Sequence, residues 1–161
     1  MTLVAIDSNV VVYAFDEEAP KKRAVADAIL VRGESVLRLP LQVVGETFRI
    51  LTKRKLLPDV QAQAVLVELM ELFTTIPFDQ GSVRVAMRLF VAHSIPYWDA
   101  LLVATAASHR CGLLLSEDFQ DGRVFAARDA GGSAVRIVNP FAAKNRPLLE
   151  AAGVLSPVSE L

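Results

Sequence analysis

The feature that most constrains the fold is a short apolar run that ends abruptly in polar residues. Residues 2–6 (Thr-Leu-Val-Ala-Ile) favour a strand, and Asp7-Ser8-Asn9 follow directly. Runs of this kind are typical of strands that are buried on both faces of a parallel sheet. In open α/β sheets, ligands bind outside the carboxyl ends of the strands. Asp7 is therefore expected at the edge of the sheet where a site can form.

Further apolar runs alternate with segments of helical periodicity. Strands are predicted at residues 2–6, 35–39, 76–78, 113–115 and 134–138. Helices are predicted at residues 21–31, 41–55, 58–73, 82–93 (capped by Ser82) and 97–110, and a glycine-containing loop at residues 121–132. This alternation favours βαβ units, a parallel sheet and right-handed crossovers. The predicted fold class is therefore α/β.

The length of 161 residues fits one domain with one sizeable core. We assign residues 1–141 to that domain and residues 142–161 to a C-terminal tail. A short helix at residues 148–155 is expected to pack on the domain or on a partner. The helix at residues 58–73 is apolar over more than one face, which favours an interface, although a monomer core would also explain it.

Composition excludes several classes of protein. No apolar run reaches the ~18 residues that a transmembrane helix needs, and the N-terminus lacks the pattern of a signal peptide. Cys111 is the only cysteine, which excludes an internal disulfide and a cysteine-based zinc site. We therefore expect a cytoplasmic protein with no membrane partner. The net charge of −1 does not by itself indicate nucleic-acid binding.

Four acidic residues lie in or beside apolar sequence that should be buried. Asp7 and Asp118 follow predicted strands, whereas Glu46 and Asp99 lie in the first halves of predicted helices. Helices that run antiparallel to the strands begin at the carboxyl edge of the sheet, so all four acids are expected there. Buried carboxylates are paired, neutralised or bound to metal. Because no set of buried basic partners is evident, the four acids favour a hard cation such as Mg²⁺ or Mn²⁺.

Each acid also has a simpler interpretation. Asp7 and Asp118 could shape turns, and Asp99 could favour the positive end of its helix. Glu46 could pair with Arg49 or Arg110. Only the four acids taken together favour a metal site.

The order and spacing of these motifs resemble the PIN-domain ribonucleases, and most of all the VapC-type toxins of bacterial toxin–antitoxin modules. The resemblance rests on Ile-Asp-Ser-Asn-Val at residues 6–10, Gly-Glu at 45–46, Trp-Asp-Ala-Leu-Leu-Val-Ala-Thr-Ala at 98–106 and Leu-Ser-Glu-Asp-Phe-Gln-Asp-Gly at 115–122. It spans residues 4–141. It implies a three-layer α/β/α sandwich on a parallel five-stranded sheet, Mg²⁺- or Mn²⁺-dependent cleavage of RNA, a homodimer, and inhibition by an antitoxin protein.

The resemblance also implies roles for individual residues. The family's acidic quartet falls on Asp7, Glu46, Asp99 and Asp118, and an additional acid of some relatives falls on Asp121. Ser116 matches the serine or threonine that often precedes the last acid by two residues, and Asn9 matches the polar residue after the first acid. Both are expected to form hydrogen bonds that hold the metal-binding acids, rather than to act as nucleophiles.

The resulting hypothesis is an endoribonuclease that uses a metal-activated water. Asp7, Asp99 and Asp118 would hold the metal directly or through water. Glu46 and Asp121 would orient waters or bind a second ion.

The RNA would be drawn to this acidic site by basic residues nearby. The candidates are Arg49, Lys53, Arg54 and Arg123, whose contacts with phosphate would depend on salt; a solvated helix face is the alternative for each. Tyr97 and Trp98 could stack a base, or could pack in the core or in a dimer.

Three rival functions stay open. A haloacid-dehalogenase-like phosphatase would use Asp7 as nucleophile, but it needs a second aspartate where Asn9 stands. A receiver-like signalling module needs a lysine after the last strand, where Asn139-Pro140 stands instead. A non-catalytic binding module on the PIN fold is disfavoured by the intact acids.

Overall fold

The computed structural model describes residues 1–158, and its centre is a six-stranded sheet in the order β3-β2-β1-β4-β6-β5. Its strands are β1 (Leu3–Ile6), β2 (Leu37–Pro40), β3 (Thr74–Ile76), β4 (Cys111–Leu115), β5 (Val124–Phe125) and β6 (Val135–Val138). Every pairing is parallel except that of β5 with β6, which is antiparallel. The first strand of the chain, β1, therefore lies in the middle of the sheet between β2 and β4.

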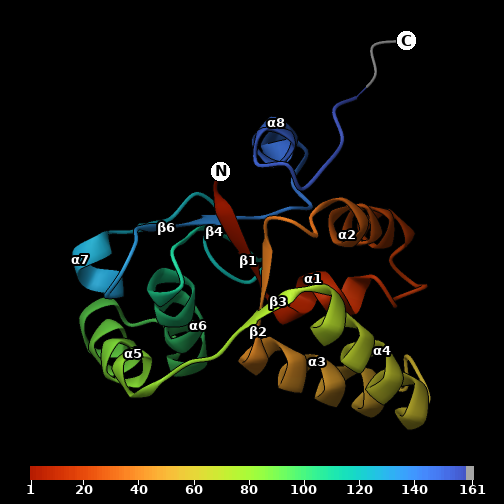
Figure 1. The fold of residues 1–161 in the computed structure, drawn as a ribbon, viewed down its shortest axis with the longest axis horizontal. Coiled ribbons are helices and arrows are strands. Elements are labelled where there is room, and N and C mark those ends of the chain that lie inside the picture. The colour runs from red at the N-terminus through yellow and green to blue at the C-terminus, as the bar shows by residue number, and fades with distance from the viewer. Residues whose placement is uncertain (159–161) are drawn as a thin grey trace.

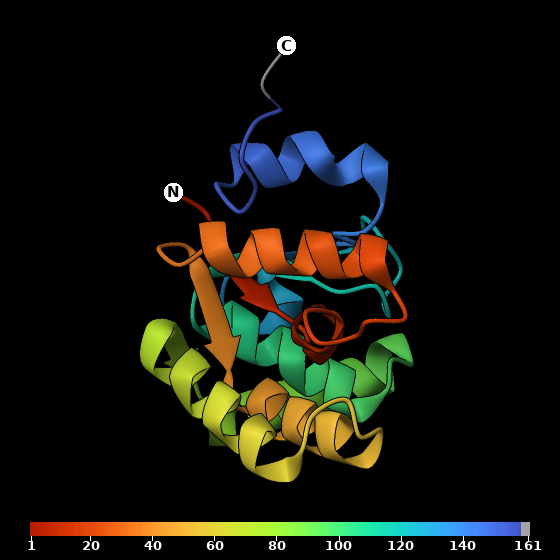
Figure 2. The ribbon, with the colours of Figure 1, turned by 90° about the vertical axis from the view of Figure 1, so that its right-hand side faces the viewer.

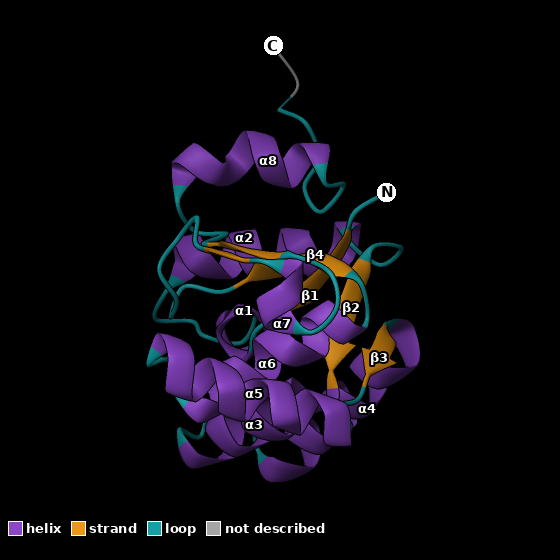
Figure 3. Ribbon diagram, turned by 90° about the vertical axis from the view of Figure 1, so that its left-hand side faces the viewer, coloured by secondary structure: helices purple, strands orange, loops and turns teal. Residues whose placement is uncertain are grey.

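Helices cover both sides of the sheet. They are α1 (Ser8–Tyr13), α2 (Pro20–Arg32), α3 (Leu41–Lys53), α4 (Asp59–Leu72), α5 (Gln80–His93), α6 (Tyr97–Ser108), α7 (Ala127–Ala130) and α8 (Arg146–Ala151), with a 3₁₀ turn at Ala143–Asn145. In Figure 1, α5, α6 and α7 lie on one side of β1 and β2, and α1, α2 and α4 lie on the other. Figure 3 views the side that α5, α6 and α7 cover. The predicted α/β class, with helices flanking a mostly parallel sheet, is confirmed.

The core is centred on β1, β4 and α6. Val4, Ala5 and Ile6 of β1 are fully buried, as is Leu114 of β4. Every residue of α6 from Ala100 to Ala107 is also buried. A helix that is apolar on all sides must be buried on all sides, and its alanines let the sheet and α5 approach closely. The end of β1 and the part of α6 that follows its first turn consequently lie in the core.

The structure corrects the predicted strand count. Five strands were expected, whereas β5 adds a sixth within the segment that was expected to be a loop. This strand has only two residues, which is too short to produce a recognisable alternation of polar and apolar side chains. It pairs at the edge of the sheet, away from β1.

Several element boundaries differ by a few residues from the sequence prediction, including that of the C-terminal helix, which was expected at residues 148–155 and lies at Arg146–Ala151. Two other differences have a clear local cause. The strand expected at residues 76–78 lies at Thr74–Ile76, and Pro77, which has no N–H to donate to a neighbouring strand, follows it. The helix expected to be capped by Ser82 is capped by Asp79, whose side chain accepts from the Ser82 N–H at 2.8 Å. The Ser82 hydroxyl accepts from the Asp79 N–H in return, so the two residues form a capping box.

The C-terminal segment contains the short helix α8. Leu149 and Val154 of this segment are fully buried in the main apolar cluster. Figure 2 shows α8 beside α2, and Arg146 and Leu155 line a cavity together with Ala24 and Ala28 of α2. Residues 142–155 thus contact the domain, and residues 159–161 lie outside the described part of the chain.

Candidate active site

The first contact at the site joins the ends of two neighbouring strands. Ile6 of β1 is paired in register with Leu115 of β4, and the Asp7 N–H donates to the Leu115 carbonyl at 2.9 Å. The next residue along β4 is Ser116, whose hydroxyl donates to Asp7 Oδ2 at 2.6 Å. The parallel register therefore places Asp7 and Ser116 side by side at the carboxyl edge of the sheet.

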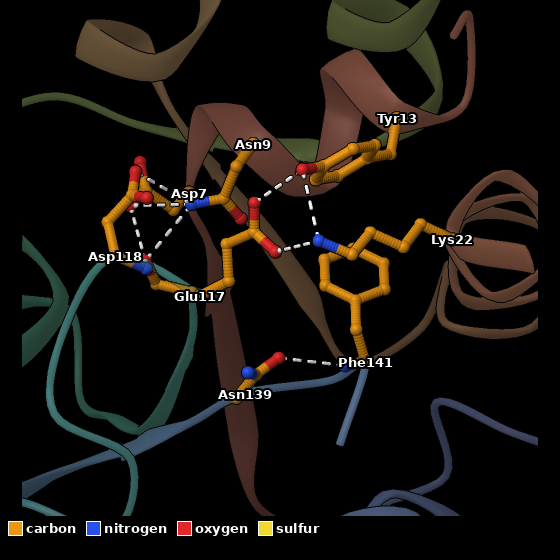
Figure 4. A network of polar contacts seen from close by, with 9 residues as sticks. Asp7, Asn9, Tyr13, Lys22, Glu117, Asp118, Asn139 and Phe141 are labelled. Carbon is orange, nitrogen blue, oxygen red and sulfur yellow. Dashed lines mark hydrogen bonds and ion pairs between the residues drawn. The ribbon is translucent and has the colours of Figure 1, made fainter. Parts of the chain in front are cut away.

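Asn9 connects these residues to Asp118. Its Nδ2 lies 3.1 Å from Ser116 Oγ, 3.2 Å from Asp118 Oδ2 and 3.4 Å from Asp7 Oδ2. The Asp118 N–H also donates to Ser116 Oγ, at 3.1 Å. Figure 4 shows this cluster, with Asp7, Asn9 and Asp118 turned toward one another. Ser116 and Asn9 therefore each contact the side chains or backbone of both Asp7 and Asp118.

The pKa shifts indicate that Glu46 and Asp99 lie near Asp7 and Asp118. The pKa of Asp7 is raised from 3.8 to about 6, first by burial and to a smaller extent by the nearby charges of Asp118 and Glu46, although hydrogen bonds from Ser116 and Ser8 act in the opposite direction. The pKa of Asp99 is also raised, first by burial and then by Asp118 and Glu46. Such repulsion acts only between neighbouring charges. We call Asp7, Glu46, Asp99 and Asp118 the acid corner.

The acid corner is not neutralised by basic side chains. Among residues 1–158, the salt bridges of the structure join other residues, and none includes a carboxylate of the acid corner. Asp7 is only 5% exposed, so water compensates its charge poorly. The corner therefore carries an unbalanced negative charge.

This donor set fits a hard divalent cation. Carboxylate oxygens are the ligands that Mg²⁺ and Mn²⁺ prefer, and the buried Asn9 Oδ1 beside them has no hydrogen-bond partner in the described residues. Within that same range, no three acidic, histidine or cysteine side chains are already close enough together to hold one ion. The fit is therefore to a hydrated cation that one or two carboxylates contact directly, which is the usual arrangement for Mg²⁺.

Glu46 is oriented by a neighbour on its own helix. Gln42 Nε2 lies 3.0 Å from Glu46 Oε1, one turn along α3, and 2.9 Å from the Trp98 carbonyl oxygen. Gln42 thus connects α3 to the first turn of α6, which carries Asp99. The contact fixes the relative position of two acids that lie on different helices.

A second network holds the segment that carries Asp118. Glu117 accepts from the Tyr13 hydroxyl at 2.6 Å and from Lys22 Nζ at 2.7 Å. Lys22 Nζ lies 4.7 Å from the centre of the Tyr13 ring, and that ring meets Phe141 edge to face at 5.0 Å. Figure 4 shows this network beside the acid corner. Elements α1, α2 and the chain after β6 therefore converge on the residue next to Asp118.

Asp121 belongs to a different network. Its carboxylate accepts from the Asn139 N–H at 2.8 Å and from Asn145 Nδ2 at 2.9 Å, and it pairs with Lys144 at 2.8 Å. Burial alone would raise the pKa of Asp121, but these hydrogen bonds and the lysine hold it below its usual value. Unlike the acid corner, Asp121 has a cationic partner, and its contacts connect the loop after β4 to the chain after β6.

The four basic residues expected to bind RNA have different surroundings. Arg49 and Lys53 are exposed and line a cavity of about 320 Å³ together with Glu46 and Ile50. Arg54 pairs with the buried Asp16 at 3.0 Å, whereas the Arg123 guanidinium lies 4.6 Å from the centre of the Phe125 ring. Arg49 and Lys53 are thus the basic residues nearest to an acid of the corner along α3.

A comparison with known families supports the same architecture. The sequence model of the PIN domain matches residues 4–124, which is more than half of the chain. The chain belongs to the PIN domain family. The matched residues include the acid corner, Asn9 and Ser116.

Solved structures share the fold of this PIN domain. FitAcB from Neisseria gonorrhoeae is 20% identical with a TM-score of 0.57, and the match covers 86% of this chain and 99% of that one. VapC20 of Mycobacterium tuberculosis, a toxin that cleaves the sarcin–ricin loop, is 17% identical with a TM-score of 0.58, over 83% and 98%. VapBC2 from Rickettsia felis, bound to a DNA fragment from its promoter, is 14% identical with a TM-score of 0.57, over 86% and 100%. A search of curated proteins gives no match.

Sequence analysis missed the residues that hold the acids in place. Gln42 was detectable, because a glutamine four residues before a glutamate lies on the same helix face. Lys22, Tyr13 and Glu117 were not, because no local pattern connects a lysine on α2 with a glutamate after β4.

The helices of the PIN domain within residues 1–158 include none with the length and hydropathy of a membrane span.

Proposed function

We propose that this PIN domain is a metal-dependent endoribonuclease and the toxin of a toxin–antitoxin pair. The observation that supports the proposal best is the acid corner, in which four carboxylates from four elements repel one another without a basic partner. A module that binds no cation gains nothing from such a destabilising arrangement, whereas a metal-dependent nuclease needs carboxylates that hold a cation close to the scissile phosphate.

Asp7, Asp99 and Asp118 are proposed to hold Mg²⁺ or Mn²⁺, with one or two of them in direct contact and the rest bound through water. When bound, the cation supplies a more acidic water and offsets negative charge on the scissile phosphate. Ser116 and Asn9 hold Asp7 and Asp118 in position, so little reorganisation is needed as the site loads. Asp121, which is already paired with Lys144, is proposed to support the loop after β4 and could reach a second ion only by leaving that lysine.

Glu46 is proposed to orient the attacking water. Gln42 fixes Glu46 Oε1, which leaves the second oxygen of the carboxylate able to accept a hydrogen bond from a water. A water held on that side would be aligned for attack on the phosphorus, opposite the leaving oxygen.

The RNA substrate is proposed to cross the cavity beside Glu46. Arg49 and Lys53 line this cavity and can contact phosphates on the approach to the acids. Arg54 and Arg123 are secondary candidates, because each already has a partner, Asp16 and Phe125 respectively. Binding should accordingly weaken steeply as salt increases.

A homodimer and an antitoxin are the proposed protein partners. Large apolar side chains are exposed on α3, α4 and α5, namely Phe48, Val60, Val67, Leu72, Met87, Phe90 and Val91. Solvent-exposed apolar patches are typical of protein interfaces. Light scattering that finds only monomer would remove the homodimer from this proposal.

The proposal is tested by mapping new RNA ends in cells that express the chain. Expression should arrest growth and create new ends at defined positions, and the Asp7→Ala variant, expressed to the same level, should do neither. A purified chain that releases inorganic phosphate from phosphate monoesters, and leaves RNA intact, would favour the phosphatase alternative. Identical RNA ends with both variants would refute the nuclease assignment.

A further inference from the structure

Trp98 is exposed beside the acid corner. It is the only tryptophan of the chain, it precedes Asp99 in the first turn of α6, and 60% of its surface is exposed. An exposed indole leaves a large apolar face in water, and tryptophans with an accessible face commonly serve in recognition. Its exposure also excludes the interpretation that Trp98 is a core residue.

One contact is made to the indole of Trp98 and another to its backbone. The Tyr97 ring meets the indole edge to face, with the ring centres 5.1 Å apart and the planes at 72°. The Trp98 carbonyl accepts from Gln42 Nε2 at 2.9 Å, and the same amide group donates to Glu46 at 3.0 Å. A ring with an aromatic neighbour has fewer conformations to lose when a ligand covers it. Gln42 also connects the backbone of Trp98 to Glu46.

The charges along α3 indicate what kind of ligand would cover the ring. From Gln42, Glu46 lies about 6 Å along the helix axis, Arg49 about 10 Å and Lys53 about 16 Å. An exposed ring, an acidic centre and two basic side chains therefore follow one another along one line. A flexible polyanion that carries flat rings matches this order, because its rings can stack on the indole while its phosphates reach the basic side chains.

We propose that Trp98 is a base-stacking residue, which holds one unpaired base of the RNA substrate on its indole. This inference rests on the proposed nuclease function and assigns a substrate-positioning role to one residue beside the acid corner. In an RNA duplex the bases are already stacked and cannot cover the ring. Stacking tolerates any base, so Trp98 selects for strand state rather than for sequence.

The single tryptophan permits a direct binding test by indole fluorescence. Asp118→Asn protein in Mg²⁺ is titrated with three probes: a uridine homopolymer, the same polymer in duplex with an adenosine homopolymer, and inorganic polyphosphate. The single strand should quench the indole, whereas the duplex and the polyphosphate, which offers charge without bases, should leave it nearly unchanged. Equal quenching by all three probes, or none by the single strand, would overturn the proposal.

Cleavage kinetics give a second test in the unmodified background. Trp98→Ala should raise KM for a single-stranded RNA by about tenfold with little change in kcat, and Trp98→Phe should restore most of the loss. Phe78→Ala is the matched control. Phe78 is another exposed aromatic residue, but it lies far from the acid corner. Its neighbour Pro77 contacts His109 at the far end of α6, and His109 is about 16 Å along the helix axis from Trp98.

The outcomes separate this inference from the proposed function. If the chain cuts RNA but Trp98→Ala leaves KM unchanged, the stacking role is wrong and the nuclease assignment stands. If the indole is quenched only by the single strand but no RNA is cut, the stacking role stands and the nuclease assignment is wrong. If Trp98→Ala changes the mass in light scattering at unchanged RNA affinity, the indole belongs to a protein interface, which also overturns the proposal.

Discussion

The Ser116 hydroxyl donates to the Asp7 carboxylate at 2.6 Å, although the two residues are 109 positions apart in the chain. Parallel pairing of β1 with β4 creates this contact. It helps to hold a buried carboxylate in place and, through the Asp118 N–H, helps to hold a second one.

Replacing Ser116 with alanine should lower activity more than stability. The variant loses the donor to Asp7 and the acceptor for the Asp118 N–H, so both carboxylates become less well oriented. Loss of a residue that supports metal ligands typically costs about 10–100-fold in metal affinity or activity. RNA cleavage measured over a range of Mg²⁺ concentrations checks this expectation.

Ser133→Ala is the control for Ser116→Ala. Ser133 also bonds through its hydroxyl, to the carbonyls of Ala107 and Cys111, but it lies at the other end of β4. Its removal should leave the Mg²⁺ dependence unchanged. A similar loss of activity in both variants would indicate a general effect on folding.

The stability of the metal-free protein should fall as the pH rises from about 4 to about 7. Burial raises the pKa of Asp7 from 3.8 to about 6, so the folded state binds a proton there that the unfolded state has already released. Stability is therefore lost as the pH rises through this window, by at most about 3 kcal/mol. Asp7→Asn has no such proton to lose, and its denaturation midpoint, in chelator, should vary less over the same window. An equal slope for both proteins would contradict the pKa assigned to Asp7.

Divalent cations should stabilise the folded protein. A ligand at 100 times its Kd adds about 2.7 kcal/mol to the free energy of unfolding. Mg²⁺ or Mn²⁺ should raise the Tm of the wild type, and more so at pH 8 than at pH 5, because at pH 5 a proton on Asp7, whose pKa is about 6, competes with the cation. Asp118→Asn should respond less. Sodium at the same ionic strength is the control, and an equal rise with sodium would mean that no specific cation site exists.

The ion pair between Lys22 and Glu117 should affect activity through Asp118. Lys22→Met removes a partner that lies 2.7 Å from Glu117, so the segment that carries Asp118 becomes less constrained. Because Lys22 is partly exposed, the stability cost should stay within about 1 kcal/mol, while cleavage should fall several-fold. Arg23→Met is the matched control, since Arg23 pairs with the exposed Glu17. A larger loss of cleavage in Arg23→Met than in Lys22→Met would contradict this role.

The sequence was informative about the site where its periodicity alone indicates in which direction a strand or helix runs relative to the sheet. Asp7 and Asp118 follow parallel strands, and the helices that carry Glu46 and Asp99 begin at the same edge, so their convergence could be predicted without any contact being known. The partners that hold these acids could not, because they depend on how helices cross. Gln42 reaches the Trp98 carbonyl only through the packing of α3 beside α6.

Segments without periodicity were the least predictable. Asp121 is followed by a glycine, and its pairing with Lys144 joins two irregular stretches that no sequence pattern connects. The two-residue strand β5 is too short to be recognised from the sequence, and its only pairing in the described residues is with β6, whose place in the sheet the sequence does not reveal. The cap of α5 was assigned to Ser82 rather than Asp79 because both residue types favour that position.

Metal-dependent cleavage of RNA by the purified chain and by Asp99→Asn tests the account most directly. Asparagine preserves the shape of the aspartate and removes one of the charges that repel one another in the acid corner, so in chelator the variant should fold with a Tm at least as high as that of the wild type. The wild type should cut single-stranded RNA in Mg²⁺ or Mn²⁺ and not in chelator, and Asp99→Asn should cut at less than about a hundredth of that rate. Undiminished cleavage by Asp99→Asn, or cleavage by the wild type in chelator, would contradict the assignment of the acid corner as the catalytic site.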